Sequence, residues 1–278
     1  MSKIFTRTFR ARWGELDPTG AVSPANYLRY LIEAAWDFGD SFGLGADVSQ
    51  ELNLFWVIRD TEIHFLCPLR HGDIFDFTIW LINWQKVRGT RCFELTLKES
   101  GEAIARGTQQ VVSMDMKTGR PASPPPGLMD TFLFENPRVF PIARFPKIEA
   151  VETPHVTQRQ VEWMDLDVYD HVNNSVYVSY AEEALAQDFS SRGWPPMKLA
   201  EASLSVATRR LHIQYGSLAT WGETLNISTH PLHVNGTGGS RYIGIARADG
   251  SSVAECILDW ELVDRKSGEA IPLPDGLR

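Results

Sequence analysis

Two segments of the chain carry apolar residues at helical spacing. The first predicts a helix from about residue 25 to 42 and is marked by Tyr27, Leu31, Ala34, Ala35, Phe38 and Phe42. The second predicts a helix from about 175 to 189 and is marked by Val176, Tyr177, Tyr180, Ala184 and Phe189. Gly43 and Gly193 follow at the points where a helix stop is expected.

Runs rich in β-branched and aromatic residues surround each predicted helix. A short strand is expected before each helix, near residues 4–13 and 157–163. Four strands are expected after the first helix, near 55–66, 74–84, 90–98 and 103–114. Four more follow the second helix, near 202–215, 224–231, 241–248 and 253–263. Turn-like sequences at 98–101 and 234–239 indicate hairpins. A helix followed by an antiparallel sheet that can wrap it predicts an α+β domain.

The two halves of the chain are copies of one another. The sequence RWGELD at 12–17 aligns with EWMDLD at 162–167, and the same offset joins Tyr27 to Tyr177 and Arg91 to Arg241. After one deletion the register changes by one residue, and Gly119 then matches Gly268. This period is the length of a small domain and too long for a solenoid repeat. The chain is therefore expected to contain two domains of one fold.

A proline-rich stretch separates the copies and is expected to be an extended connector. Its prolines are Pro121, Pro124, Pro125, Pro126, Pro137, Pro141, Pro146 and Pro154. Its phenylalanines, Phe132, Phe134, Phe140 and Phe145, predict that it packs on a surface. The expected boundaries are 1–122 for the first domain, 123–154 for the connector and 155–278 for the second domain.

Composition narrows the classes of function. Hydrophobic residues make up 43% and charged residues 22% of the 278 residues, as in a globular protein with a proper core. A net charge of −8 argues against nucleic acid as a partner. Three widely spaced cysteines suggest no disulfide framework and no zinc knuckle. No apolar run approaches a membrane span. Residues 1–10 have no apolar core of a signal sequence and align with an internal strand, so the cytoplasm is the expected compartment.

The motifs resemble those of the hot-dog thioesterases. The sequences WGELDPTGAV (13–22), NY (26–27) and FLCPLRHGD (65–73) are similar to the 4-hydroxybenzoyl-CoA thioesterase type. The sequence WMDLDVYDHVNN (163–174) is similar to the motif of plant and bacterial acyl-acyl-carrier-protein thioesterases. The resemblance implies two tandem hot-dog domains, each a sheet wrapped around a long helix, that pack as a pseudo-dimer with their sheets side by side. It also implies hydrolysis of fatty acyl thioesters without a cofactor, a metal or a covalent serine.

The residues themselves argue for this chemistry. Asp17 and Asp167 each precede a predicted helix, whose N-terminus offers unpaired N–H groups and a positive dipole end. A carboxylate can activate water or attack a thioester directly, and the amides can hold the oxyanion. In the family, the oxyanion donor is the backbone N–H seven residues after the Asp. That residue is Asn174 in the second copy, whereas it is Pro24, which has no N–H, in the first.

Asp167 is therefore the predicted catalytic carboxylate, and the Asp17 site is predicted to be weak or silent. His171 supports the choice, because its counterpart in the first copy is Ala21. Tyr169 stands where the plant enzymes carry Asn, and Ala219 where they carry Glu. A simpler mechanism is thus expected, in which His171 orients water or substrate and Asn173 and Tyr169 contact the substrate.

Structural explanations exist for each candidate. An Asp before a helix is most often a cap or turn residue, and Asn173 and Asn174 are suited to starting a helix. His171 could simply bond a loop carbonyl. For Asp17 the structural and catalytic interpretations have equal weight, whereas for Asp167 catalysis is favoured.

The acyl carrier is expected to be anionic, since both acyl carrier protein and coenzyme A are. The tandem resemblance favours acyl carrier protein, with acyl-CoA second. Either would need cations at the mouth of the site. The candidates are Arg209 and Arg210, with Arg88, Arg91 and Arg241. Further association into a homo-oligomer is left open.

Three other patterns are expected to carry no chemistry. The sequence GDSFG at 39–43 matches a nucleophile elbow, but Ser41 falls at the end of a helix instead of between strand and helix. Cys67 is expected to be a small buried hydrophobe. His230 and His233 lack a third ligand, so no metal is predicted. The alternative functions are a hot-dog protein that binds acyl thioesters without hydrolysing them and a hot-dog dehydratase or hydratase.

Overall fold

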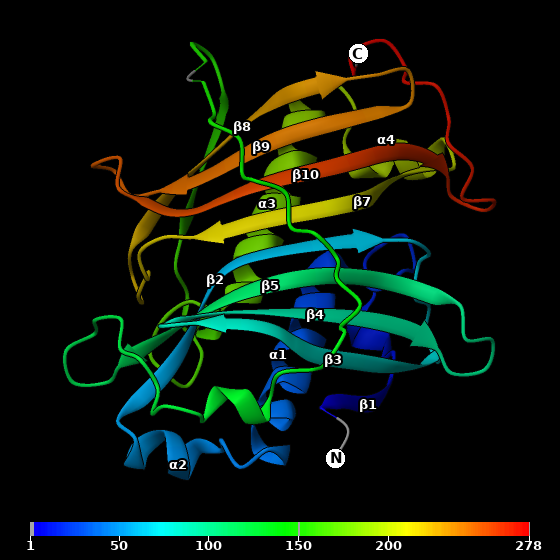
Figure 1. Ribbon diagram of the computed structural model, residues 1–278. Coiled ribbons are helices and arrows are strands. Elements are labelled where there is room, and N and C mark those ends of the chain that lie inside the picture. The colour runs from blue at the N-terminus through cyan, green and yellow to red at the C-terminus, as the bar shows by residue number, and fades with distance from the viewer. Residues whose placement is uncertain (1–2, 150, 278) are drawn as a thin grey trace. The chain divides into compact units, whose positions relative to one another are not determined.

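The computed structural model describes residues 3–149 and 151–277, and it divides into two compact units, Met1–Ala143 and Arg144–Arg278. Each unit contains one long helix and one antiparallel sheet (Figure 1). The fold class predicted from the sequence, two tandem α+β hot-dog domains, is confirmed.

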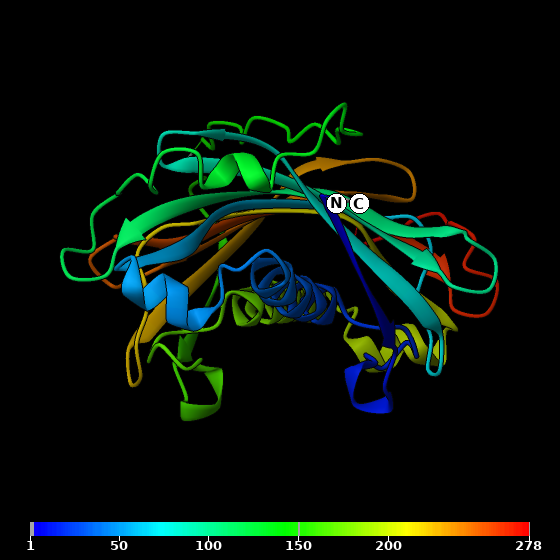
Figure 2. The same cartoon turned by 60° about the horizontal axis from the view of Figure 1, so that its bottom comes forward.

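The first unit is built from five strands and two helices. The strands are β1 (Ile4–Arg10), β2 (Leu54–Phe65), β3 (Ile74–Gln85), β4 (Arg88–Leu97) and β5 (Ala103–Asp115), arranged in the order β1-β3-β4-β5-β2. All neighbouring pairs are antiparallel. The long helix α1 (Pro24–Ser41) lies in the hollow of the sheet (Figure 2), and the short helix α2 (Ala46–Glu51) follows it.

The second unit repeats this arrangement. Its strands are β6 (His155–Gln160), β7 (Leu204–Tyr215), β8 (Thr224–Val234), β9 (Gly238–Ala246) and β10 (Ser252–Asp264), in the order β7-β10-β9-β8-β6. Neighbouring strands are again antiparallel. Helix α3 (Asn174–Ser191) is the long helix and α4 (Pro196–Glu201) is the short one. The two domains therefore share one topology, as the internal repeat predicted.

The sheet curves around the helix because one face of each strand is apolar and turned toward it. In the first unit Phe75, Phe77 and Phe93 are fully buried on this face. Tyr30 of α1 packs edge-on against Phe75, with ring centroids 5.0 Å apart. Burying aromatic side chains of this size supplies most of the driving force for the packing of helix on sheet.

The connector packs on the outer face of the first sheet, as its phenylalanines predicted. Phe140 is 9% exposed and packs with Trp80 and Cys92 in one apolar cluster. The Trp80 indole N–H donates to the carbonyl of Arg138 at 2.8 Å. Phe132 lies against the C-terminal end of α1 and is 2% exposed. The connector therefore contributes to the core of the first unit.

Most predicted element boundaries are accurate to about two residues, whereas the end of β8, the start of β9 and the ends of β1 and β6 each differ by three. Trp13 and Trp163 were expected in strands but begin the 3-10 turns η1 (Trp13–Glu15) and η3 (Trp163–Asp165). In η3 the Asp165 carboxylate accepts the backbone N–H of Glu162 at 2.8 Å, which closes the turn. Helices α2 and α4 were not predicted, because six residues are too few to show helical periodicity. Among the described residues, no helix is long and apolar enough to cross a membrane.

Candidate active site

Asp167 lies in a tight loop between η3 and α3. A single β-bridge between Leu166 and Val172 closes the loop. Inside it, the Asp167 N–H donates to the carbonyl of His171 at 2.9 Å, and the Asp170 N–H donates to the Asp167 carbonyl at 3.1 Å. Asp170 adopts φ +60°, a left-handed conformation that Asp tolerates better than most residues. This turn fixes the direction of the Asp167 and His171 side chains.

The carboxylate of Asp167 is accessible and only partly hydrogen-bonded. Its Oδ1 accepts the backbone N–H of Tyr169 at 2.9 Å and lies 3.6 Å from Nδ1 of His171. The two side chains are 22% and 21% exposed. A carboxylate in this position can accept a proton from water, and the adjacent imidazole can orient that water or the substrate.

Helix α3 begins directly after this loop. Asn173 is its N-cap residue, and its side chain accepts the N–H of Ser175 at 3.0 Å. Asn174 is the first helical residue, so its N–H has no acceptor within the helix and lies at the positive end of the helix dipole. The sequence thus places a carboxylate, an imidazole and a helix-start amide within one segment of eight residues, 167–174.

Tyr169 covers the side of this loop. Its ring lies nearly parallel to that of His171, with centroids 6.1 Å apart, and the residue is 54% exposed. Burial and the charge of Asp167 raise the pKa of the Tyr169 hydroxyl. The Tyr169 hydroxyl is therefore neutral at pH 7. An aromatic ring thus stands at the position where the plant enzymes carry the polar amide of Asn.

A buried acid anchors the loop from below. Asp165 is 7% exposed, and its carboxylate accepts the hydroxyl of Tyr180 on α3 at 2.6 Å. The carbonyl of Asp165 accepts the N–H of Asn173 at 2.9 Å. These bonds tie η3 to the first turns of α3.

The matching site in the first unit differs in its chemistry. Oδ1 of Asp17 accepts both the N–H of Thr19, at 2.7 Å, and the hydroxyl of the same residue. Helix α1 begins with Pro24, so no amide hydrogen occupies the position of the Asn174 N–H. The two carboxylates therefore differ in their hydrogen-bond partners and in the amide at the start of the helix that follows, and their predicted difference in activity stays a prediction.

The arginines proposed for the mouth are engaged elsewhere. Arg209 and Arg210 lie in β7, where Arg209 contacts Glu261 at 2.7 Å and Arg210 contacts Asp259 at 2.6 Å. Arg241 is 3% exposed and contacts Asp188 of α3 at 2.8 Å. The expectation for Arg241 is wrong, because a helix carboxylate draws its side chain into the core.

Ser41 and Cys67 make structural contacts, but Cys67 lies just after β2 and is partly exposed, so the expectation that it is buried is wrong. Ser41 ends α1, and its hydroxyl donates to the carbonyl of Phe38 at 2.9 Å. Burial raises the pKa of the Cys67 thiol, which disfavours a nucleophilic thiolate. Among the described residues, no cluster of three His, Cys, Asp or Glu side chains could hold a metal ion.

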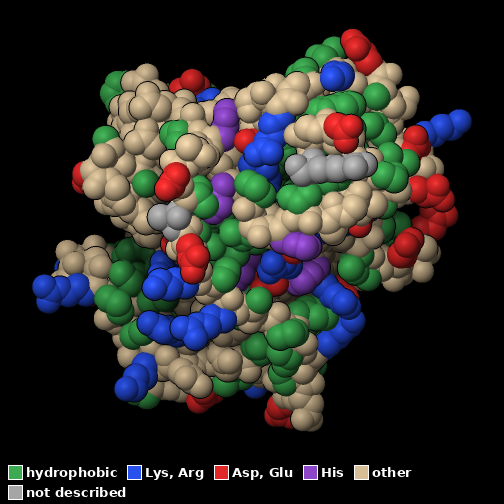
Figure 3. Space-filling view, turned by 90° about the horizontal axis from the view of Figure 1, so that it is seen from above, with side chains coloured by type: hydrophobic (Ala, Val, Ile, Leu, Met, Phe, Trp, Pro, Cys, Tyr) green, Lys and Arg blue, Asp and Glu red, His purple; other side chains and the backbone are tan. Residues whose placement is uncertain are grey.

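A cavity of about 980 Å³ lies within the second unit, between residues 144–154 and the outer face of the sheet. Its lining includes Phe145, Lys147, His230, Tyr242 and Glu255 and no residue of the Asp167 loop. On the face drawn in Figure 3, histidine and basic side chains likewise lie among apolar ones. The cavity is therefore separate from the site around Asp167.

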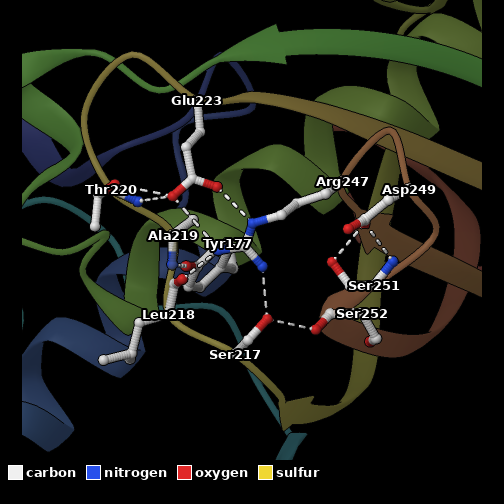
Figure 4. Close-up of polar contacts among 10 residues, drawn as sticks. All are labelled: Tyr177, Ser217, Leu218, Ala219, Thr220, Glu223, Arg247, Asp249, Ser251 and Ser252. Carbon is white, nitrogen blue, oxygen red and sulfur yellow. Dashed lines mark hydrogen bonds and ion pairs between the residues drawn. The ribbon is translucent and has the colours of Figure 1, made fainter.

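Two functional candidates were not identified from the sequence, Arg247 and Glu223. Arg247 forms an ion pair at 2.6 Å with Glu223, the last residue of the loop 217–223 (Figure 4). That loop contacts the Asp167 segment, because Val172 donates its N–H to the carbonyl of Ala219 at 2.9 Å. No motif joins residues this far apart along the chain, so only the fold reveals the pair.

Each unit has a long helix wrapped by an antiparallel sheet, and in the second unit the Asp167 carboxylate precedes that helix. This arrangement defines a tandem hot-dog protein. The model of the Thioesterase-like superfamily matches residues 11–132 and 161–278. The chain belongs to this family.

Individual relatives agree with this assignment. The chloroplastic dodecanoyl-[acyl-carrier-protein] hydrolase of Umbellularia californica is 25% identical over 198 residues, which is 66% of this chain and 51% of that protein. The long-chain acyl-CoA thioesterase FadM of Escherichia coli is 28% identical over 127 residues, 44% of this chain and 92% of that protein. The structure of the 12:0-ACP thioesterase from Umbellularia californica superposes with a TM-score of 0.77 at 22% identity, covering 94% of each chain. The chain spans about half the length of the plant relatives that it matches.

Proposed function

We propose that this protein hydrolyses fatty acyl thioesters of acyl carrier protein or coenzyme A and releases the free carboxylic acid. The observation that carries the proposal is the Asp167 carboxylate, which lies in one loop with His171 and directly before the helix-start amide of Asn174. The proposal is supported by membership of the thioesterase-like family and by the relatives named as an acyl-carrier-protein hydrolase and an acyl-CoA thioesterase.

In the proposed reaction, water attacks the thioester carbonyl while Asp167 accepts a proton from that water. The N–H of Asn174 donates to the oxyanion of the tetrahedral intermediate. Collapse of the intermediate breaks the C–S bond, and the thiolate of the carrier takes up the proton. His171, 3.6 Å from Asp167, orients the water. Direct attack by the Asp167 carboxylate is the other route, in which an acyl anhydride forms first and water then hydrolyses it.

The substrate class rests on two relatives with different carriers. One is named for dodecanoyl-acyl-carrier protein and the other for long-chain acyl-CoA. The first name specifies a medium-length acyl chain and the second specifies long acyl chains. The tandem architecture favours acyl carrier protein as the carrier. Tyr169 and Asn173 are the proposed substrate contacts, because they flank His171 and the helix start.

The test is release of free thiol from a panel of acyl-CoA and acyl-carrier-protein thioesters. Wild type, Asp167→Asn and the matched variant Asp17→Asn are compared on each substrate. Asp167→Asn is expected to lose turnover and Asp17→Asn to keep it. If the wild type releases no thiol from any member of the panel, the hydrolase proposal is wrong. Unchanged acyl-CoA affinity in Asp167→Asn would then favour acyl binding, and loss of enoyl thioester absorbance would favour a hydratase.

A further inference from the structure

Arg247 follows directly after β9 and binds the loop 217–223 at three points (Figure 4). Its Nε donates to Oε2 of Glu223 at 2.6 Å. One terminal nitrogen donates to the hydroxyl of Ser217 at 2.7 Å, and the other donates to the carbonyl of Leu218. A guanidinium can hold several acceptors in one plane, so this side chain fixes both ends of the loop.

Glu223 completes the contacts within the loop. Its Oε1 accepts the N–H of Thr220 at 2.8 Å and the hydroxyl of the same residue at 2.9 Å. The hydroxyl of Ser217, which accepts a hydrogen bond from Arg247, donates one to the carbonyl of Ser252 at 2.8 Å. The loop is therefore held by charge-assisted bonds of Arg247 and Glu223 and by the bond from Ser217 to the first residue of β10.

The braced loop is hydrogen-bonded to the candidate active site. Val172, which lies between His171 and Asn173, donates its N–H to the carbonyl of Ala219 at 2.9 Å. The N–H of Ala219 donates to the hydroxyl of Tyr177 on α3 at 3.4 Å. One residue of the loop thus contacts both the Asp167 segment and the helix that carries Asn174.

We infer that Arg247 and Glu223 are positioning residues for thioester hydrolysis, which act through the loop 217–223 to set the carboxylate of Asp167 against the helix-start amide of Asn174. The inference rests on the proposed function. Neither side chain contacts substrate in this scheme. Their role is to hold Ala219, and through it Val172, in the place that aligns the site.

The first unit supplies an internal comparison. Its loop has the same backbone frame, because Val22 donates to the Leu69 carbonyl at 2.9 Å and Leu69 donates to the Tyr27 hydroxyl at 3.1 Å. The acid is also retained, since Asp73 accepts the N–H of Arg70 at 2.8 Å.

The basic residue, however, is different in the first unit. By strand pairing the counterpart of Arg247 is Leu97, because Ala246 pairs with Asn226 as Thr96 pairs with Asp76. The neighbouring basic residue is Lys98, whose ammonium donates to Thr8 at 3.0 Å and lies 3.8 Å from Asp76. Lys98 therefore binds strands β1 and β3 instead of the loop. Among the described residues, an arginine brace of this loop is therefore found in the unit that also has His171 and Asn174, the proposed catalytic residues, and not in the other.

The electrostatics of Tyr177 support the proximity of these groups. Burial raises the pKa of its hydroxyl to about 12, and the charges of Arg247, Glu223 and Asp167 all act on it as well. The hydrogen bond from Arg247 lowers the pKa of Glu223, so the acid is ionised throughout the neutral range. The ion pair and the carboxylate of Asp167 thus share one electrostatic environment.

The expected effects of breaking the brace separate positioning from simple stabilisation. An ion pair between partly exposed residues contributes little to the free energy of unfolding. Misplacement of reacting groups by an ångström, in contrast, can lower a rate by roughly 100-fold. The inference therefore predicts a large loss of kcat with a small loss of stability.

The experiment compares Arg247→Gln, Arg247→Lys, Glu223→Gln and the double variant with wild type in the thiol-release assay. Lys98→Gln, at the basic residue that follows the matching position, and Asp73→Asn, at the counterpart of Glu223, are the controls from the first unit. The Gln variants are expected to lower kcat by about 10- to 100-fold with KM changed by less than about threefold. Arg247→Lys should recover part of the loss, the double variant should be no worse than either single one, and both controls should match wild type. Equal losses in kcat for the controls, or a wild-type kcat in Arg247→Gln, would overturn the inference.

Amide hydrogen exchange gives a second readout that does not depend on turnover. In Arg247→Gln, exchange in the segment 166–174 is expected to become faster than in wild type, while the segment 16–24 of the first unit stays unchanged. If wild type has no thioesterase activity, the proposed function fails and exchange alone decides whether the brace orders this loop. Unchanged exchange in 166–174 would show that Arg247 does not position it.

Discussion

Asp17 and Asp167 occupy equivalent places in the two domains but differ in how their carboxylates are used. Asp17 accepts two hydrogen bonds from Thr19, one from the N–H and one from the hydroxyl. Asp167 accepts the N–H of Tyr169 and has an imidazole 3.6 Å away. The Thr19 hydroxyl that bonds to Asp17 would compete with water for that carboxylate, whereas no hydroxyl among the described residues is bonded to Asp167.

The first prediction concerns the oxyanion donor. Asn174→Pro removes the N–H at the first helical position, where proline is tolerated and where the preceding residue already has extended dihedrals, φ −60° and ψ 137°. Turnover is expected to fall by about 100- to 1,000-fold while the fold is kept. Steady-state kinetics and circular dichroism measure the two effects. The reciprocal variant Pro24→Asn should leave turnover unchanged, and full activity in Asn174→Pro would exclude this amide.

His171 should contribute to the rate rather than to stability. Its side chain is 21% exposed, lies 3.5 Å from the carbonyl of Val172 and stacks on the ring of Tyr169, besides its approach to Asp167. His171→Ala is therefore expected to lower kcat by roughly 100-fold with little change in the unfolding midpoint. His71→Ala in the first unit is the control. If the two variants lose activity equally, His171 has no special role.

The third prediction uses two arginines at equivalent positions. Arg241 contacts Asp188 at 2.8 Å, and both side chains are 4% exposed. The residue of the first unit that matches Asp188 is Phe38, and no acidic side chain among the described residues forms an ion pair with Arg91. Its guanidinium bonds only the amide oxygen of Gln109.

Desolvation lowers the pKa of the partly exposed Arg91 to about 10, well below its ordinary value. Keeping Arg91 charged therefore lowers the free energy of unfolding at all pH values below about 10. This cost is lost as the pH rises from about 10 toward the pKa of arginine in the unfolded chain. At pH 7, Arg91→Met is expected to raise the free energy of unfolding by about 1 kcal/mol. Arg241→Met is expected to lower it by up to about 3 kcal/mol, because the buried Asp188 then has only Arg192, at 3.0 Å, as its ion-pair partner among the described residues. Urea denaturation of both variants measures the difference. A destabilised Arg91→Met would mean that its bond to Gln109 outweighs the cost of burial.

The cysteines should be inert in the native protein. Cys92 and Cys256 are fully buried, and burial raises the pKa of the Cys67 and Cys256 thiols. Titration with a disulfide reagent at pH 7.5 is expected to give slow reaction of at most Cys67 in native protein and rapid reaction of three thiols in urea. Alkylation of Cys67 should not change turnover. Rapid inactivation by the reagent would instead indicate a cysteine in the mechanism.

The sequence predicted the parts of the site that are local. Asp167, His171 and Asn174 fall within one loop and one helix start, and the repeat allowed each position to be compared with Asp17, Ala21 and Pro24. Helical periodicity placed α1 and α3 within one or two residues of their observed bounds for the same reason.

The parts that were missed depend on distant pairings. Arg247 reaches Glu223 only because β8 and β9 pair, and Arg241 is buried only because α3 presents Asp188 to it. Nothing in the sequence distinguishes such an arginine from one at a solvated strand end. Side-chain direction across a curved sheet therefore sets the limit of the sequence-based interpretation.

The way the connector packs affects the order of events during synthesis. Phe140 covers Trp80 and Cys92, yet it is translated long after β5 ends at Asp115. The first domain therefore cannot bury this cluster until the connector has left the ribosome, although all of its strands are already complete. Ribosome-bound chains that stop before Phe140 will expose an apolar patch, and chaperones recognise such a surface. Completion of the first domain therefore depends on the connector that follows its last strand.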